Sequence, residues 1–483
     1  MTSPKNYLMM IDGEMAAAES GQWLASLNPA NEEEIGRVPV AGAADIERAV
    51  KAGLRAQPGW NDTPVAERAS LLREVGKRLI ERQKEILELE VRDTGNTVGK
   101  MRHDLGAAVA QMDYYAGLGL EVKGETVPAS PHTWHLAMRE PYGVVGRIVP
   151  FNHPIYFAIS ALAGPLMTGN SVIVKTPDQS PLSGAVLGEV CREVLPKGVV
   201  NIVSGTGLVT GDAIVRHPLV RRISFTGSVP TGLAIQRAAA ETCVKHVTLE
   251  LGGKNPMVVF PDIDPDKAAD EAIAGMNFAW QGQSCGSRSR LMVHEAIYDA
   301  VVSRVRERVA DIVMGDPLDP GAQMGPINSK AHYLRVLHYV QAGKEDGARL
   351  LHGGNRPAGK LFEKGYWLEP TVYADVTMDM RIAKEEIFGP VLSILRWKDE
   401  DEAIAMANAT QYGLSAAIWT HDLKAAINMG RKIDCGYVWI NTAGSHFLGT
   451  PFGGSKNSGV GREESLSELL SYTQSKAFHI ALR

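Results

Sequence analysis

Cysteines are few in this sequence, and they stand far apart. Cys191, Cys243, Cys285 and Cys435 form no C-x-x-C pair and no Cys/His cluster in 483 residues, so neither a zinc site nor a disulfide framework is expected, and no metal. Long apolar runs are also missing. The N-terminal stretch MTSPKNYLMMIDGE is too short in apolar residues for a secretory signal, and no stretch reaches the length of a membrane span. These absences predict a cytoplasmic protein without a membrane partner.

The chain has no excess of basic charge. Lysine and arginine number 50 against 55 aspartates and glutamates, a formal charge of −5, so there is no electrostatic reason to expect nucleic acid as a partner. Hydrophobic residues at 45% and 49 glycines are typical of a globular protein with many tight turns. A length of 483 residues exceeds what one core supports and predicts two or more domains.

Short apolar runs alternate with helical stretches from Tyr142 onward, which predicts an α/β protein with a doubly wound parallel sheet. Ligands are then expected at the carboxyl ends of the strands. A second α/β region resumes after Cys285. The expected strands are 143–149, 171–175, 199–203, 222–226, 247–250, 290–294, 366–374, 391–397 and 415–419, and the expected helices are 155–167, 181–195, 208–216, 230–241, 267–280, 295–313, 329–347 and 401–409.

The first 140 residues have a different pattern. Helices are expected at 45–54, from Pro64 to about Gly95 and at 103–118, and a protruding hairpin is expected at 120–140. The tail 471–482 has strand character and could pair with this hairpin or with another subunit.

Cys285 lies in QGQSCGSRSR, directly after a predicted helix. Small residues on both sides let a substrate carbon come close and let backbone N–H groups point at it, as a nucleophilic thiol requires. The competing interpretation is a buried small hydrophobe, which suits Cys191 and Cys243 better.

Four further loops offer partners for such a thiol at predicted strand ends. Asn152 in PFNHP could donate to an oxyanion, although a turn asparagine is the simpler interpretation. Lys175 and Asp178 in KTPDQSP could bind ribose or phosphate oxygens, or line a solvated loop. Gly227 in FTGSVPTG precedes a helix and could form an anion site, and Glu250 in LELGG could be a general base or accept backbone N–H bonds.

Together with EEIFGP at 385–390 and PFGGSKNSGVGRE at 451–463, these motifs resemble, in order and spacing, those of the aldehyde dehydrogenase superfamily over nearly the whole chain. The resemblance implies a non-acylating NAD(P)-dependent aldehyde dehydrogenase of EC 1.2.1 type. It makes Cys285 the nucleophile. Asn152 and the backbone N–H of Cys285 would then donate hydrogen bonds to the oxyanion that forms. It makes Glu250 the base that activates water, and it adds Glu463 to the proton path and Lys175 to the catalytic set.

For the cofactor the resemblance implies NAD, with NADP possible. Asp178 departs from the glutamate of many NAD-preferring members, but keeps the charge that repels a 2′-phosphate. The expected cofactor residues are Ile148, Val149, Pro150, Phe151, Lys175, Thr176, Asp178, Gly207, Gly211, Phe225, Thr226, Gly227, Ser228, Thr231, Leu251, Gly252, Glu386 and Phe388.

For the substrate, aromatic walls favour an aromatic or medium-length apolar aldehyde, with a semialdehyde or amino-aldehyde as the alternative. Arg288 could meet a substrate carboxylate, although the sequence favours a side chain that points away. The expected pocket comprises His153, Tyr156, Phe157, Trp280, Ser284, Gly286, His446, Phe452 and the segment 442–448.

The resemblance also implies a division of the chain. A cofactor domain would comprise 1–119 and 141–251, a catalytic domain 252–446, and an oligomerisation element 120–140 and 470–483, with 447–469 returning to the cofactor side. A homodimer or homotetramer is expected. Alternatives are a CoA-dependent acylating enzyme, which the presence of Glu250 disfavours, a catalytically silent binding protein, which the presence of Cys285, Glu250 and Asn152 disfavours, and a cysteine hydrolase.

Overall fold

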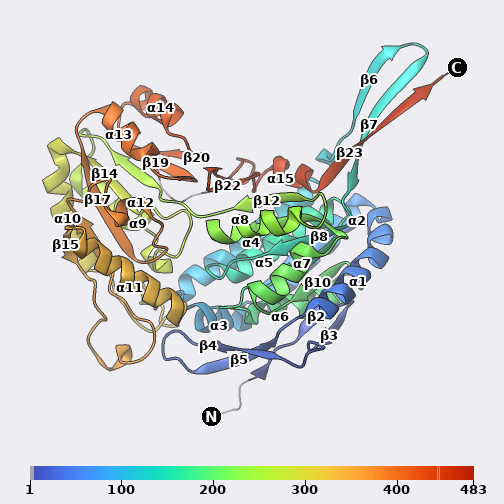
Figure 1. Cartoon of the computed structure of the whole chain (residues 1–483), viewed down its shortest axis with the longest axis horizontal. Coiled ribbons are helices and arrows are strands. Elements are labelled where there is room, and N and C mark those ends of the chain that lie inside the picture. Colours follow the sequence, from blue (N-terminus) through green and yellow to red (C-terminus); the bar gives the residue numbers. More distant parts are fainter. Residues whose placement is uncertain (1–4, 443, 445, 483) are drawn as a thin grey trace.

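The computed structural model describes residues 5–442, 444 and 446–482. Figure 1 shows two α/β parts side by side and a narrow sheet that projects from them at the upper right. Ala443 and Ser445, which belong to the segment predicted at the substrate pocket, lie outside the described residues, as does Arg483 of the predicted oligomerisation tail.

An eight-stranded sheet forms the centre of the first part, in the order β22-β12-β11-β8-β9-β10-β2-β3. The five strands from β12 to β10 run parallel, which confirms the predicted doubly wound sheet. Because parallel strands end at one edge, the loops after β8, β9, β11 and β12 meet there. The strands are β2 (Met9–Ile11), β3 (Glu14–Ala16), β8 (Val144–Ile148), β9 (Ser171–Lys175), β10 (Val200–Val203), β11 (Val220–Thr226), β12 (His246–Glu250) and β22 (Gly459–Val460).

Helices cover both faces of this sheet (Figure 1). The stretch predicted as one helix from Pro64 to Gly95 is two helices, because the backbone at Arg82 leaves the helical region with φ −95° and ψ 12°. The helices are α1 (Ala43–Asp62), α2 (Val65–Glu81), α3 (Gln83–Thr94), α4 (Val98–Gly117), α5 (Pro154–Met167), α6 (Leu182–Val194), α7 (Asp212–Arg216) and α8 (Val229–Ala240).

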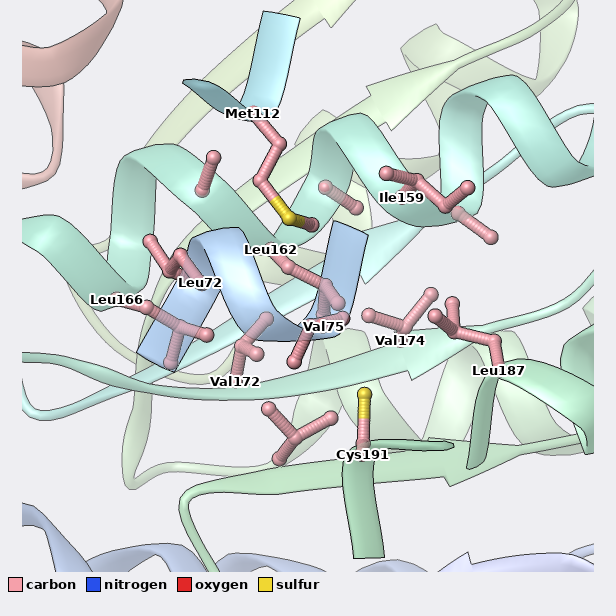
Figure 2. Packing of buried hydrophobic residues seen from close by; sticks show 14 of the residues in the cluster. Leu72, Val75, Met112, Ile159, Leu162, Leu166, Val172, Val174, Leu187 and Cys191 are labelled. Carbon is pink, nitrogen blue, oxygen red and sulfur yellow. The ribbon is translucent and has the colours of Figure 1, made fainter. Parts of the chain in front are cut away.

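The core of the first part is built around α5, which is apolar on almost every side. Because α5 has no polar stripe, it is buried between the sheet and a second layer formed by α2 and α4. Figure 2 shows how side chains from α2, α4, α5, α6 and β9 interlock there: Leu72, Val75, Met112, Ile159, Leu162, Leu166, Val172, Val174, Leu187 and Cys191. Cys191 is a packed apolar group, as predicted.

The second part contains a seven-stranded sheet in the order β15-β16-β17-β14-β13-β19-β20, parallel except for β15. Its strands are β13 (Pro256–Val259), β14 (Arg290–His294), β15 (Arg349–His352), β16 (Thr371–Ala374), β17 (Val391–Trp397), β19 (Ser415–Trp419) and β20 (Tyr437–Ile440). Its helices are α9 (Pro265–Gly275), α10 (Tyr298–Ala310), α11 (Lys330–Glu345), α12 (Arg381–Lys384), α13 (Glu400–Asn408) and α14 (Leu423–Lys432).

Three predictions for this part were wrong at their boundaries. The strand expected at 366–374 begins only at Thr371, because Tyr366 and Glu369 donate to the loop carbonyls of Pro29 and Asn355. The helix expected at 295–313 starts as a 3₁₀ turn and is α-helical only over Tyr298–Ala310. The helix expected at 267–280 ends at Gly275, and this third difference shapes the site described below.

The projecting sheet joins chain segments that are more than 300 residues apart. The hairpin of β6 (Glu125–Ser130) and β7 (Thr133–Pro141) pairs with β23 (Thr473–Ala481), so the tail binds the hairpin of its own chain. Trp134, Met138 and Phe478 are exposed on it. The remaining elements are β1 (Lys5–Asn6), β4 (Trp23–Leu27), β5 (Glu34–Pro39), β18 (Tyr412–Gly413), β21 (Ser455–Lys456) and α15 (Leu466–Ser471). None of the described helices has the length and apolar content needed to cross a membrane.

Candidate active site

Cys285 sits in a tight loop that follows α9. The helix stops because Asn277 and Gln281 adopt left-handed backbone conformations, with φ of 58° and 53°. Asn255, at the start of β13, donates from Nδ2 to the carbonyl oxygens of Cys285 (2.7 Å) and Ser287 (3.0 Å). The backbone at Cys285 and directly after it is therefore held by Asn255.

The Cys285 thiol is in a low-dielectric environment next to carboxylates. Burial is the main cause that raises its pKa to about 12, and the negative charges of Glu386, Glu250 and Glu463 add to the effect, whereas the Gly286 N–H opposes it. In the free protein the group is therefore a neutral thiol, and a nearby base must remove its proton when it reacts.

Asn152 lies beside Cys285 in the lining of one cavity. It lies in the loop after β8, between Ile148 and α5, and is buried, with 5% of its surface exposed. Asn96 donates from Nδ2 to the Asn152 carbonyl at 2.9 Å, which fixes the backbone of the loop. The sequence gives little sign of this support, because Asn96 stands in an ordinary helix-ending stretch.

Glu250 is the last residue of β12 and lines the same cavity. Both carboxylate oxygens are buried and have no hydrogen-bond partner among the described residues. Burial, followed by the charge of Glu463, raises its pKa well above the usual value. A carboxyl group that is desolvated and unpaired beside a thiol is suited to move protons.

Glu463 is close to this group but is held differently. Arg147 in β8 reaches its Oε1 with Nη1 at 3.4 Å and also donates to Tyr472 Oη at 2.6 Å. Burial and repulsion from Glu468 raise the pKa of Glu463 to about 7, and Arg147 limits the rise. Arg147 is a residue that the sequence analysis missed, although an arginine inside an apolar strand is itself a signal of a buried charge pair.

The cavity has a volume of about 800 Å³ and runs from Cys285 across the carboxyl ends of β8, β9, β11 and β12. Most of the predicted cofactor residues line it: Ile148, Val149, Pro150, Phe151, Lys175, Asp178, Gly207, Gly211, Phe225, Thr226, Gly227, Ser228, Thr231, Leu251, Gly252, Glu386 and Phe388. Thr176 does not line it and instead donates to the Val203 carbonyl. Lining residues that the sequence analysis missed include Leu208, Val215, Ile235, His332 and Arg335.

One end of the cavity offers groups suited to a ribose and a phosphate. Lys175 is buried, and its Nζ lies 3.7 Å from Asp178 Oδ1. Across the cavity, Ser228 caps α8 by accepting from the Thr231 N–H, so the helix N-terminus opens toward the space. The residue types and the shape both fit the adenosine and pyrophosphate portions of a dinucleotide.

The other end is formed by Glu386 and Phe388, from the second α/β part. Glu386 accepts a hydrogen bond from the Gly253 N–H at 2.9 Å, and an added Cβ at Gly252 would lie 2.0 Å from its Oε2. Only glycine allows this approach. Phe388 has φ of 57°, and its carbonyl is bonded by His332 Nε2 at 2.6 Å, which fixes the ring toward Phe151.

Among the described residues predicted for the substrate pocket, only Phe157 lines the cavity that contains Cys285, and Trp280 lines a separate pocket. His153 is held by Asp104 at 2.7 Å and lies near Trp280, with ring centroids 5.3 Å apart. Phe157 contacts His153 and reaches the cavity. Ser284 and Gly286 flank the thiol in sequence and are partly and fully buried, respectively.

A second group of aromatic rings packs around Phe452. His446 is 4.4 Å from Phe452 between ring centroids, and its Nδ1 is 2.9 Å from Oε1 of Glu464. Tyr156 donates to the same oxygen at 3.5 Å. Glu464 was missed from the sequence because it follows Glu463 and looks like part of a solvated acidic run.

Comparison with known proteins identifies the family of the chain. The model of the aldehyde dehydrogenase family matches residues 15–478. The aldehyde dehydrogenase TropH of Talaromyces stipitatus is 43% identical over 486 aligned residues, which cover 99% of this chain and 94% of that protein.

Solved structures agree over the same length. An NAD-dependent aldehyde dehydrogenase from Sinorhizobium meliloti matches with a TM-score of 0.95 and 38% identity, covering 99% of this chain and 95% of that one. The NAD⁺ complex of an aldehyde dehydrogenase from Bacillus cereus matches with a TM-score of 0.96 and 37% identity, over 99% and 97% of the two chains. The protein is therefore a member of the aldehyde dehydrogenase family.

Proposed function

We propose that this protein oxidises an aldehyde to the carboxylic acid with NAD⁺ as hydride acceptor, through a covalent adduct on Cys285. The observation that carries the proposal is that Cys285, Glu250 and Asn152 line one cavity, which is also lined by Lys175 and Ser228. Structures of relatives at 37% identity include an NAD⁺ complex, which supports the choice of cofactor.

Cys285 would attack the aldehyde carbon after losing its proton, to give a thiohemiacetal. The negative oxygen would accept hydrogen bonds from the Asn152 side chain and from the Cys285 N–H, and donors placed in advance in a buried site stabilise such a charge strongly. Asn255 holds the Cys285 loop and Asn96 holds the Asn152 loop, so neither donor has to be reorganised during the reaction.

When bound, NAD⁺ supplies the acceptor for the hydride that leaves the aldehyde carbon. Lys175, Ser228 and Glu386 are the residues that would hold it, through its adenosine ribose, pyrophosphate and nicotinamide ribose. Asp178 would lie near the adenosine ribose, and its negative charge would disfavour a 2′-phosphate. NAD is therefore the proposed cofactor, with NADP as a weaker substitute.

Loss of the hydride leaves a thioester on Cys285, and Glu250 would take a proton from the water that hydrolyses it. Its unpaired, desolvated carboxylate supports this role, because desolvation raises the pKa of Glu250 and so makes its carboxylate a stronger base. Glu463, with a pKa raised to about 7, would pass that proton on toward solvent.

The substrate side favours an aldehyde with an aromatic or medium-length apolar body, since His153, Phe157, Trp280 and Phe452 supply its rings. A panel of aldehydes tests this. NADH formation at 340 nm, without CoA, is expected for the wild-type protein and should be lost in Cys285→Ala.

Activity that requires CoA would show that the acylating alternative is correct. A complete lack of reduction of NAD⁺ and NADP⁺ with every aldehyde, with and without CoA, would favour the binding protein. Sustained ester hydrolysis without any aldehyde oxidation would favour the cysteine hydrolase.

We also propose that the chain assembles as a homodimer or homotetramer in the cytoplasm. The projecting sheet supports assembly, because it leaves apolar side chains such as Trp134 and Met138 exposed and a strand edge open. The four free cysteines are consistent with a reducing compartment.

A further inference from the structure

Arg288 places a buried positive charge three residues after the nucleophile. Only 1% of its surface is exposed, and neither Nε nor Nη2 has a hydrogen-bond partner within residues 5–442, 444 and 446–482. Burial lowers its pKa to about 10, so the guanidinium is still charged at neutral pH. A buried charge without a partner costs free energy unless a ligand supplies the opposite charge.

Two other buried arginines, Arg290 and Arg147, are satisfied, and Arg68, whose Nε is also unpaired among the described residues, donates from Nη1 to the carbonyls of Trp60 and Asn61. Arg290 donates to the carbonyls of Lys254, Met406 and Ala407, and Arg147 is paired with Glu463. The contrast with Arg288 therefore does not come from burial alone.

The Arg288 guanidinium lies against a ring that contacts His446, one of the residues predicted for the substrate pocket. The Arg288 N–H donates to the Gly275 carbonyl at 2.9 Å, and the guanidinium carbon lies 4.2 Å from the centre of the Trp439 ring. Trp439 is in ring contact with His446, which contacts Phe452. Cys285, Trp439 and Phe452 belong to one apolar cluster, so Arg288 borders the same region as the thiol.

Gly444 faces the guanidinium. An added Cβ at Gly444 would lie 3.7 Å from Nη1, at van der Waals contact. Stacking on Trp439 holds the planar guanidinium in one orientation. A flat group with two acceptor oxygens is the natural partner of such a fork.

We propose that Arg288 binds a carboxylate at the end of the substrate remote from the aldehyde. The preferred substrate is then an aldehyde with an aromatic or apolar body and a distal carboxylate. This inference rests on the proposed function and narrows its substrate class. The aromatic rings of the pocket would contact the apolar part of the substrate, and the ion pair with Arg288 would select substrates that end in a carboxylate.

Matched pairs of aldehydes test the proposal. The pairs are 4-carboxybenzaldehyde with 4-methylbenzaldehyde, and straight-chain aldehydes of four to eight carbons that end in a carboxylate or a methyl group. In the wild type, kcat/KM is expected to favour the carboxylated member of at least one pair. In Arg288→Met that preference should fall by about 10- to 150-fold, mostly through KM, because a charged hydrogen bond is lost. Arg288→Lys should recover part of it.

Arg396→Met is the matched control, since Arg396 also stacks on an aromatic ring, Tyr298 at 4.0 Å, but on the surface of α10. It should leave the ratio of the two substrates unchanged. Calorimetry with terephthalate and 4-methylbenzoate supplies a readout without turnover: the dicarboxylate should bind more tightly to the wild type, and this advantage should vanish in Arg288→Met.

A wild type that prefers no carboxylated aldehyde and binds both acids equally would overturn the proposal, even if Arg288→Met does not fold. The proposal would also be overturned if folded Arg288→Met showed an equal fall in kcat/KM for both aldehydes of a matched pair. If no aldehyde is oxidised at all, the proposed function fails, and the calorimetric comparison alone then decides whether Arg288 binds a carboxylate.

Discussion

Replacing Glu250 by glutamine should stop the enzyme after one turnover at each site. The amide has nearly the shape of the carboxyl group, and no ion pair or hydrogen bond of the Glu250 oxygens is lost among the described residues. The folded state already favours the neutral form, because burial raises the pKa of Glu250 well above its usual value. The thermal midpoint should therefore remain close to that of the wild type or rise.

The chemical effect should be large. A positioned general base contributes about 10²- to 10⁴-fold, and glutamine cannot accept the proton of the hydrolytic water. Glu463 is a poor substitute, because its carboxylate is bound to Arg147. Steady-state kcat should fall by about 10²- to 10⁴-fold. Hydride transfer comes before hydrolysis, so one NADH per active site should still form quickly.

Stopped-flow absorbance at 340 nm measures the burst, and intact-protein mass spectrometry measures the acyl group on Cys285. Glu468→Gln is the control: this second buried glutamate is bound to Tyr115 and to the Glu464 N–H, so it should retain multiple turnovers. The reasoning is refuted if Glu250→Gln keeps kcat within about threefold of the wild type, or if it forms neither a burst nor an acyl-enzyme while remaining folded.

Three further predictions concern other residues. Asn152→Ala should lower the rate of the NADH burst by about 10²- to 10³-fold with little change in KM, measured by stopped flow, because one oxyanion donor is lost. Asp178→Ser should lower the NAD/NADP ratio of kcat/KM, and an unchanged ratio would show that Asp178 does not face the 2′ position. Burial raises the pKa of Glu90 to about 8, so the folded protein keeps a proton that the unfolded chain releases above its ordinary pKa of about 4.5. Stability from this group is thus full below pH 4.5 and declines up to about pH 8, by at most about 1.4 kcal/mol per pH unit. Glu90→Gln should remove that decline in urea unfolding at pH 5 to 8, and parallel profiles for the two proteins would contradict it.

The sequence predicted the α/β architecture well where the pattern is strong. The strands at 171–175 and 222–226 and the helix at 155–167 lie close to their expected places, because buried parallel strands and a proline-started apolar helix have distinct signatures. The stretch 267–280 was predicted less well. Its helix-forming residues continue past Gly275, but the backbone turns left-handed at Asn277, where contacts with the loop after Cys285 (Ser287 and Arg288) replace the helix.

The sequence alone determined the kinds of chemistry that are present. A thiol among small residues, a glutamate and an asparagine at strand ends, and a run of motifs of one family can all be recognised without a structure, because each is local in the chain. These motifs predict the fold class and the residues Cys285, Glu250 and Asn152.

Tertiary structure decided which distant groups share a site and how their pKa values are shifted. Arg147 binds Glu463, which is 316 positions away in the chain, and the Arg288 guanidinium stacks on the ring of Trp439 in β20. Burial then sets how strongly a carboxyl holds its proton, as for Glu250, whose pKa it raises, and whether guanidinium nitrogens are left without a hydrogen-bond partner. The physical reason is that desolvation and charge pairing depend on the surroundings in space, which residues far apart in the sequence create together.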